Sequence, residues 1–545
     1  MKKNLIYLLF FLPFFTHAQH IYTKQDSLRG SLSPLRTCFD VVHYDLNLRV
    51  DIDNQAISGY NKISYKVLQP FQKLQLDLFE NLAIDSIVAD NKKLNFVREG
   101  KAFFVEFATP QTITATGICN SLAVYYHGKP TIAVNPPWDG GFTFAKDKQQ
   151  RTWLGVSCEG IGASIWYPNK DHLSDEPDSM RIYCEVPKGL ICVANGNLKS
   201  QKNTSDNFTG FEWKVSYPIN NYNVTLNIAN YAQIKDIYVS GKDTLQVDYY
   251  VLDYNKTKAE KHFQQAKTML ACFEKYFGKY PFWQDGYALV ETPYWGMEHQ
   301  GAIAYGNNYK NLEEGFDFIL IHESGHEYFG NSLSVNDHAE MWIHESFTTY
   351  TETLYMEYTK GYKEALKYLW KQRKNIANVT PMLGHLGVNY DGWVGSDIYY
   401  KGTWLLHSLR NTIDNDSIWF ATLKEYAEKF KISQVTTEQT ISFFSEKTGK
   451  NLLPIFNQYL RYAKPPKLVY YLSQDKKNTI LHYRWQADEA DFAMPMKVKN
   501  SEFANQYQTI FPTKDFQTLT LKGNVENPQF AEELFYFELL KVDKN

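Results

Sequence analysis

The sequence predicts a multidomain α+β fold with an N-terminal all-β domain, a mostly helical middle domain and a small C-terminal β module. Residues 38–232 contain short runs in which apolar and polar residues alternate, whereas residues 256–462 show apolar residues at helical spacing. Alternation returns after Pro465-Pro466. With 545 residues, 44% of them hydrophobic, the chain can form several cores. We predict the boundaries 1–18 for a signal peptide, 19–235 for the β domain, 236–462 for the helical domain and 463–545 for the β module.

The first residues have the pattern of an export signal. Lys2 and Lys3 precede an apolar run from Leu5 to Phe15, and Thr16-His17-Ala18 places small residues before a cleavage site. The run is too short to span a bilayer comfortably, so cleavage before Gln19 is favoured over an uncleaved anchor. We therefore expect an exported protein, periplasmic or extracellular, with no stable membrane span.

Within the β domain, alternation begins at Phe39–Leu48 and is stricter at Leu74–Leu78 and Phe211–Val215. Turn residues such as Pro136-Pro137 and Asp139-Gly140-Gly141 separate the strands. These signals predict an all-β domain of short strands.

The helical domain opens with the clearest periodicity in the chain, over Thr257–Phe277. One face of this predicted helix carries Ala259, Phe263, Ala266, Met269, Leu270, Phe273 and Tyr276. Further helices are predicted at Trp404–Arg410 and Phe420–Phe430. Strands are expected again at Leu481–Trp485 and Phe516–Leu521, in the C-terminal module.

Charge and cysteine content narrow the function classes. The net charge is -3 and the chain has no block of like charges, which argues against a nucleic-acid partner. Six cysteines in an exported protein permit disulfides, but no pair has zinc-knuckle spacing. Cys184 and Cys192 flank Pro187-Lys188-Gly189, a predicted hairpin turn, and either a disulfide or buried thiols would fit. The oligomeric state is not predicted.

The middle domain contains His322-Glu323-Ser324-Gly325-His326, and Glu345 follows after eighteen intervening residues. Residues four apart on a helix share a face, so His322 and His326 can place two imidazoles on one metal ion. Glu345 can supply a third ligand from a following helix, which leaves a fourth position open. Three protein ligands and an open position are typical of catalytic zinc. We predict one Zn²⁺ per chain, with Glu323 as the base that activates its bound water. Two hydrogen-bonded core histidines are the alternative.

Three further motifs surround this arrangement: Tyr294-Trp295-Gly296-Met297-Glu298-His299, Trp342-Ile343-His344-Glu345-Ser346-Phe347 and Tyr399-Tyr400-Lys401-Gly402. With H-E-x-x-H-x18-E, they resemble the M1 family of zinc aminopeptidases, and the likeness covers most of the mature chain. The resemblance implies a thermolysin-like catalytic domain and peptide substrates with a free N-terminal amine.

The resemblance also implies roles for single residues. Met297-Glu298 matches the Met-Glu of the family's G-x-M-E-N motif, so Glu298 would bind the substrate's α-amine, with Gly296 and Met297 as further substrate-binding candidates. Ser157-Cys158-Glu159 resembles the segment that supplies a second acceptor, which makes Glu159 its candidate. Tyr399 falls where the family has a tyrosine that stabilises the oxyanion. Tyr400 is a rival, but consecutive helical residues diverge by about 100°, so only one can face the zinc.

Several positions depart from the family's pattern. Trp295 replaces the first glycine of the motif, where its bulk could narrow the pocket or hydrogen-bond the substrate, and His299 replaces the asparagine. Gly325 lies inside the zinc helix at a cost of about 1 kcal/mol relative to alanine, which suggests close packing.

The leading hypothesis is a secreted zinc metallo-aminopeptidase with Glu323 as general base. A thermolysin-like zinc endopeptidase is the second hypothesis, and it would not need Glu298 and Glu159 to bind an amine. A catalytically silent, zinc-free peptide-binding scaffold is disfavoured, because the chain keeps His322, Glu323, His326 and Glu345.

Overall fold

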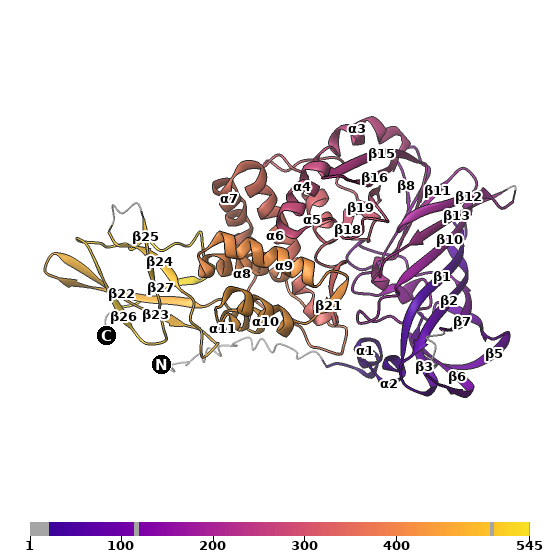
Figure 1. The fold of residues 1–545 in the computed structure, drawn as a ribbon, viewed down its shortest axis with the longest axis horizontal. Helices are drawn as coiled ribbons and strands as arrows, with labels where there is room; N and C mark the ends of the chain where they lie inside the picture. Colours follow the sequence, from indigo (N-terminus) through magenta and orange to yellow (C-terminus); the bar gives the residue numbers. More distant parts are fainter. Residues whose placement is uncertain (1–20, 114–118, 206, 502–505, 544–545) are drawn as a thin grey trace, which may run out of the picture.

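The computed structural model describes residues 21–113, 119–205, 207–501 and 506–543. Three parts follow one another along its longest axis: a β-rich N-terminal part, a block of helices and a small C-terminal β part (Figure 1). The predicted α+β fold class is therefore confirmed. The predicted signal peptide, residues 1–18, lies outside the described residues. In the described ranges, no helix is both long enough and apolar enough to cross a membrane.

Ten of the described strands form one large sheet in the N-terminal part, in the order β12-β13-β10-β1-β2-β7-β4-β5-β6-β3. They are β1 (Phe39–Asp51), β2 (Ala56–Val67), β3 (Phe71–Asp77), β4 (Leu82–Ala89), β5 (Lys92–Glu99), β6 (Ala102–Gln111), β7 (Asn120–Gly128), β10 (Ser179–Pro187), β12 (Asn197–Asn203) and β13 (Phe208–Val215). The predicted runs that begin at Phe39, Leu74 and Phe211 lie in β1, β3 and β13. Buried and less buried positions alternate along β10, as expected for a strand with one face on the core.

A second sheet has the order β11-β14-β9-β8. Its strands are β8 (Gly141–Lys146), β9 (Thr152–Ser157), β11 (Ile191–Ala194) and β14 (Leu226–Ala229). Both sheets contribute to one buried hydrophobic cluster. Cys184 lies in β10 and Cys192 in β11, which pairs with β14 and not with β10, so the predicted hairpin is wrong. Both cysteines are buried free thiols.

A third sheet, ordered β15-β16-β17-β19-β18, separates the two main cores. Its strands are β15 (Tyr231–Ser240), β16 (Asp243–Leu252), β17 (Tyr287–Glu291), β18 (Gly296–Met297) and β19 (Ile303–Tyr305). Successive residues face opposite cores: Tyr249 and Leu289 join the helices, whereas Tyr250 and Val290 join the N-terminal cluster. β15 crosses the predicted boundary at residue 235, and the domain boundaries stay predictions.

The described helices of the middle part are α3 (Lys256–His262), α4 (Gln265–Phe277), α5 (Phe318–Gly325), α6 (Trp342–Lys360), α7 (Tyr362–Gln372), α8 (Asp397–Ile413), α9 (Asp416–Lys429), α10 (Thr437–Thr448) and α11 (Leu453–Arg461). The single helix predicted over Thr257–Phe277 is interrupted between α3 and α4. At the interruption, the hydroxyl of Tyr249 donates to the carbonyl of Phe263 (3.3 Å), and Nε2 of Gln265 donates to that of His262 (3.2 Å). Side chains thus satisfy carbonyls where the helix is broken.

The C-terminal part contains a sheet ordered β26-β23-β22-β27 and a separate pair, β24 and β25. These strands are β22 (Lys467–Asp475), β23 (Asn478–Gln486), β24 (Met496–Lys499), β25 (Tyr507–Ile510), β26 (Gln517–Leu521) and β27 (Glu538–Lys541). Leu468 and Trp485 belong to the same buried cluster as Trp404 and Tyr459 of the helical part. The module therefore packs as an extension of the helical core.

Candidate active site

Helix α5 carries the first two predicted zinc ligands in a buried position. Its N-cap residue, Asp317, accepts hydrogen bonds from the backbone N–H groups of Ile319 (3.1 Å) and Leu320 (3.4 Å), which fixes where the helix begins. His322 lies in the helix, and His326 follows its last residue with helical backbone angles. The centroids of the two imidazole rings are 5.0 Å apart.

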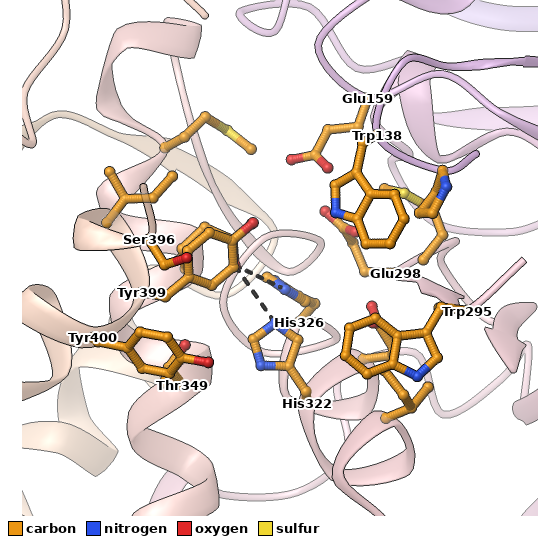
Figure 2. Close-up of a pocket in the computed structure, with 18 of the residues that line it drawn as sticks. Trp138, Glu159, Trp295, Glu298, His322, His326, Thr349, Ser396, Tyr399 and Tyr400 are labelled. Atoms are coloured by element: carbon orange, nitrogen blue, oxygen red, sulfur yellow. Dashed lines mark ion pairs between the residues drawn. The ribbon is translucent and has the colours of Figure 1, made fainter. Parts of the chain in front are cut away.

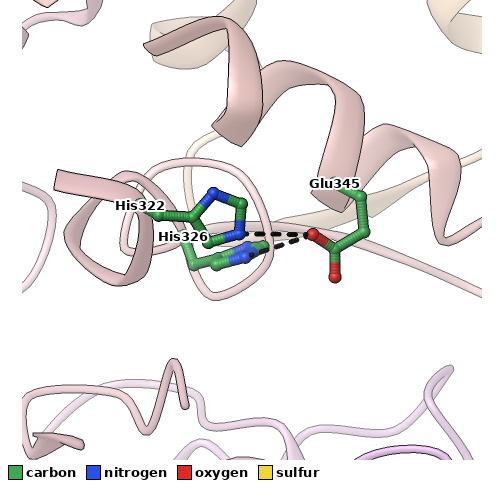
Figure 3. A group of neighbouring side chains, drawn as sticks. All are labelled: His322, His326 and Glu345. Carbon is green, nitrogen blue, oxygen red and sulfur yellow. Dashed lines mark ion pairs between the residues drawn. The ribbon is translucent and has the colours of Figure 1, made fainter. Parts of the chain in front are cut away.

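Glu345, in the first turn of α6, completes the group. Its Oε2 lies 3.5 Å from Nε2 of His322 and 3.5 Å from Nε2 of His326 (Figure 3). Ligands at the usual zinc distances in a tetrahedral site are about 3.4 Å from one another, so these three atoms fit one zinc ion. Oε2 of Glu345 is buried and accepts no hydrogen bond from the described residues. A bound zinc ion would satisfy this atom.

The Nδ1 atom of each imidazole already makes a hydrogen bond within the protein. Nδ1 of His322 donates to Oε1 of Glu352 (2.8 Å), and Nδ1 of His326 donates to the carbonyl of Phe329 (3.0 Å). Glu352 in turn accepts from the hydroxyl of Tyr368 (2.5 Å). These bonds orient both rings and leave both Nε2 atoms free for a metal.

Two glycines allow the elements of the site to approach closely. A Cβ at Gly325 would lie 2.8 Å from Oγ1 of Thr351 in α6, which confirms the close packing expected there. A Cβ at Gly296 would lie 2.3 Å from Oε1 of Glu323. The carboxylate of Glu323 therefore lies against the backbone of β18.

Two more carboxylates enter the site from different domains. Glu298 follows β18, Glu159 follows β9, and both side chains lie on the same side of the imidazoles (Figure 2). Carboxylate oxygens of Glu298 and Glu323 and a ring nitrogen of His326 all lie within 4.8 Å of one another. Desolvation, and then the charge of Glu298, raise the pKa of Glu159 well above its ordinary value. This concentration of negative charge favours a cationic group between the carboxylates.

Tyr399 lies in the first turn of α8, and its ring stacks on that of His322 with centroids 6.0 Å apart and an angle of 27° (Figure 2). Burial, and then the charge of Glu345, raise the pKa of Tyr399 well above its ordinary value. For Tyr400, burial and then the charge of Glu352 raise the pKa. A different carboxylate therefore has the largest effect on each phenol, and for Tyr399 it is that of a predicted zinc ligand.

All the predicted site residues line one cavity of about 680 Å³. Its other lining residues include three that the sequence did not predict to belong to the site: Trp138, Phe318 and Glu352. Glu352 lies two turns after Glu345 on α6, a spacing that could have identified it. Trp138 has no such signal, because it comes from a loop of the N-terminal domain.

Tyr222, also not predicted, donates from its hydroxyl to Oε1 of Glu298 (3.1 Å). It too comes from the N-terminal domain and has no local signal. His299, which replaces the asparagine of the family's motif, is fully buried and stands outside the cavity lining.

Residues 261–459 match the family model described as "Peptidase family M1 domain". Leukotriene A-4 hydrolase of Xenopus laevis is 23% identical over 450 residues, which cover 75% of this chain and 69% of the relative. Aminopeptidase N of Lactobacillus helveticus is 21% identical, with 80% of this chain and 52% of the relative covered. Aminopeptidase B of Mus musculus is 23% identical, with 52% of this chain and 45% of the relative covered. The chain spans about half the length of the last two relatives.

The fold is similar to that of an M1 zinc metallopeptidase from Deinococcus radiodurans, solved as a mutant bound to a Tyr-Ser-Ala substrate. The TM-score is 0.67 at 19% identity, and the match covers 79% of this chain and 97% of that one. His322, His326 and Glu345 all lie within the matched residues. Residues 261–459 therefore form a peptidase family M1 domain, of the family that the sequence motifs resemble.

Proposed function

We propose that this protein is an exported zinc metallo-aminopeptidase that hydrolyses the N-terminal peptide bond of peptides. The observation that carries this proposal is the position of Glu298 and Glu159, which line the same cavity as the zinc ligands. Each carboxylate would give the free α-amine a charge-assisted hydrogen bond of about 1.5–3 kcal/mol. With the amine held there, the first peptide bond is the one that reaches the zinc site.

His322, His326 and Glu345 would hold the zinc ion. When bound, zinc supplies Lewis acidity, which lowers the pKa of water and polarises a carbonyl group. Glu323 would take a proton from the attacking water and give it to the leaving nitrogen. The hydroxyl of Tyr399 would donate a hydrogen bond to the oxyanion that develops on the carbonyl oxygen.

Paired peptides test this function. One member of each pair has a free N-terminus and the other an acetylated one. We expect stepwise release of N-terminal residues from the free peptides, no cleavage of the acetylated ones, loss of activity with a chelator and recovery with zinc. Internal cleavage of the acetylated peptides would support the thermolysin-like endopeptidase instead. Peptide binding without zinc and without cleavage would support the silent scaffold.

Export is part of the proposal and rests on Lys2, Lys3, the apolar run Leu5–Phe15 and Ala18. Expression of the full chain in a bacterial host with a periplasm, followed by fractionation and N-terminal sequencing, tests it. We expect an exported protein that begins at Gln19. A cytoplasmic protein that keeps residues 1–18 would contradict export without affecting the proposed chemistry.

A further inference from the structure

A row of three aromatic rings leads away from a predicted zinc ligand along the cavity lining. The ring centroid of Phe318 lies 5.3 Å from that of His322, and that of Trp295 lies 5.6 Å from Phe318. The ring of Trp138 follows at 6.3 Å from Trp295. Figure 2 shows both tryptophans across the cavity from Tyr399. We call Phe318, Trp295 and Trp138 the aromatic wall.

Two members of the aromatic wall are exposed to an unusual degree for tryptophan in a cavity. Trp295 is 45% exposed and Trp138 is 63% exposed, and both line the cavity with the zinc ligands. Nε1 of Trp295 donates to Oδ1 of Asn307 (3.3 Å), which orients the indole. Covering such a surface with an apolar ligand group is favourable, because it removes apolar area from water and allows ring stacking.

The position of the aromatic wall relative to Glu323 indicates which part of a peptide would cover it. Trp295 directly precedes Gly296, which contacts the carboxylate of Glu323, and Phe318 lies one turn before His322 on α5. In the proposed mechanism, Glu323 gives its proton to the leaving nitrogen. The residue that carries this nitrogen therefore lies on the side of Glu323, whereas Glu298 binds the amine of the first residue.

We propose that the aromatic wall binds the side chain of the second residue of the substrate and selects an aromatic or large aliphatic residue there. This inference rests on the proposed aminopeptidase function and adds a substrate class to it. From the magnitudes of ring stacking and apolar burial, we expect a preference of about tenfold or more in kcat/KM over a small polar residue.

Three tripeptides test the proposal on the zinc-loaded full chain: Leu-Phe-Ala, Leu-Ser-Ala and Phe-Ser-Ala. For the unmodified protein, we expect Leu-Phe-Ala to exceed Leu-Ser-Ala by about tenfold or more in kcat/KM. Trp295→Ala should reduce this ratio to about twofold, and Trp295→Phe should keep most of it. Trp370→Ala is the matched control, because Trp370 is 46% exposed but lies outside the cavity lining, and it should keep the full ratio.

Binding provides a second readout. We expect Glu323→Gln to bind Leu-Phe-Ala about tenfold more tightly than Leu-Ser-Ala in calorimetric titrations, and the double variant with Trp295→Ala to lose this difference. This comparison does not depend on turnover.

Three results would overturn the proposal, in distinguishable ways. Equal cleavage of Leu-Phe-Ala and Leu-Ser-Ala would exclude the selection and leave the aminopeptidase function intact. If Trp295→Ala changed only the ratio of Phe-Ser-Ala to Leu-Ser-Ala, the wall would bind the first residue instead of the second. If none of the three peptides were cleaved, the proposed function itself would fail, and the inference with it.

Discussion

The two halves of the site are built in different ways. The metal half, His322, His326 and Glu345, comes from the consecutive helices α5 and α6. The amine half comes from two domains: Glu298 follows the edge strand β18 of the central sheet, and Glu159 follows β9 of the N-terminal domain. Helix geometry alone positions the first half, whereas the second half depends on how the domains pack.

Contacts between the domains hold the amine half in place. The hydroxyl of Tyr222 donates to Glu298, and Nδ2 of Asn331 donates to the carbonyl of Glu298 (2.8 Å). Nδ2 of Asn223 donates to Oδ1 of Asn331 (2.7 Å), so the N-terminal domain supports Glu298 both directly and through Asn331. We therefore expect changes at the domain interface to alter amine recognition more than zinc binding.

The largest effect should come from Glu323, which contacts both halves. Glu323→Gln keeps the shape of the side chain but removes the base, so we expect kcat to fall about 10²–10⁴-fold with one zinc still bound. Peptide kinetics and metal analysis of the same preparation measure both quantities. Glu291→Gln is the control: Glu291 is buried, accepts from Tyr309 and Asn255 outside the cavity lining, and its substitution should change kcat only a few-fold. Unaltered turnover in Glu323→Gln would exclude it as the base.

Tyr399→Phe should have the next largest effect, because it removes a donor from the side of the cavity opposite the amine half. Loss of one oxyanion donor typically lowers kcat about 10²–10³-fold. We expect kcat to fall much more than KM changes. Tyr400→Phe is the matched control, because the carboxylate with the largest effect on the pKa of Tyr400 is Glu352 and not a predicted zinc ligand, and it should have a much smaller effect on kcat. An effect of Tyr399→Phe on KM alone would indicate packing or binding instead.

Glu298→Gln affects the amine half alone. Loss of the charge-assisted hydrogen bond should lower kcat/KM for free-amine peptides roughly 10- to 150-fold, while zinc content stays at one per chain. Glu159→Gln should act in the same direction, because its carboxylate faces the same part of the cavity. A loss below about tenfold for Glu298→Gln would contradict its assignment to the amine, and a loss of zinc would contradict the separation of the two halves.

The different origins of the two halves, consecutive helices for the metal half and two domains for the amine half, also explain which site residues could be predicted from the sequence. Helical periodicity determines which residues share a face, so the spacing of His322, His326 and Glu345 along the chain is enough to group them. Glu298 and Glu159 become candidates only through the family resemblance. Tyr222 and Trp138 could not be predicted, because residues that meet across a domain interface leave no local pattern.

The secondary structure, too, could be predicted only where the sequence has a local pattern. Strands with one face on the core, such as β10, alternate in sequence, and the predicted run that begins at Phe211 lies in a strand of this kind, β13. The run that begins at Leu74 lies in β3, where residues 74–77 are all buried. The inner strand β17 of the central sheet is buried on both faces, so it lacks that alternation. The interruption at Phe263 was also not predictable, because the donor to its carbonyl is the hydroxyl of Tyr249 on another element.

We expect Tyr222→Phe to have the smallest effect, and it gives the sharpest test of whether the metal half and the amine half are independent. Tyr222→Phe keeps the buried ring and removes the donor to Glu298, together with a longer contact (3.4 Å) to Nδ1 of His344 in α6. The amine half thus loses one hydrogen bond, while the bonds that orient His322 and His326 stay in place. The substrate amine keeps its own bond to Glu298, and only the orientation of that carboxylate is weakened. We therefore expect KM for free-amine peptides to rise roughly two- to tenfold, about 0.4–1.4 kcal/mol, with kcat and zinc content nearly unchanged. Tyr126→Phe is the matched control, because Tyr126 is also buried in the N-terminal domain and its hydroxyl has no partner among the described residues. If Tyr222→Phe instead lowered zinc content and KM stayed constant, the domain interface would support the metal half, and the two halves would not be independent.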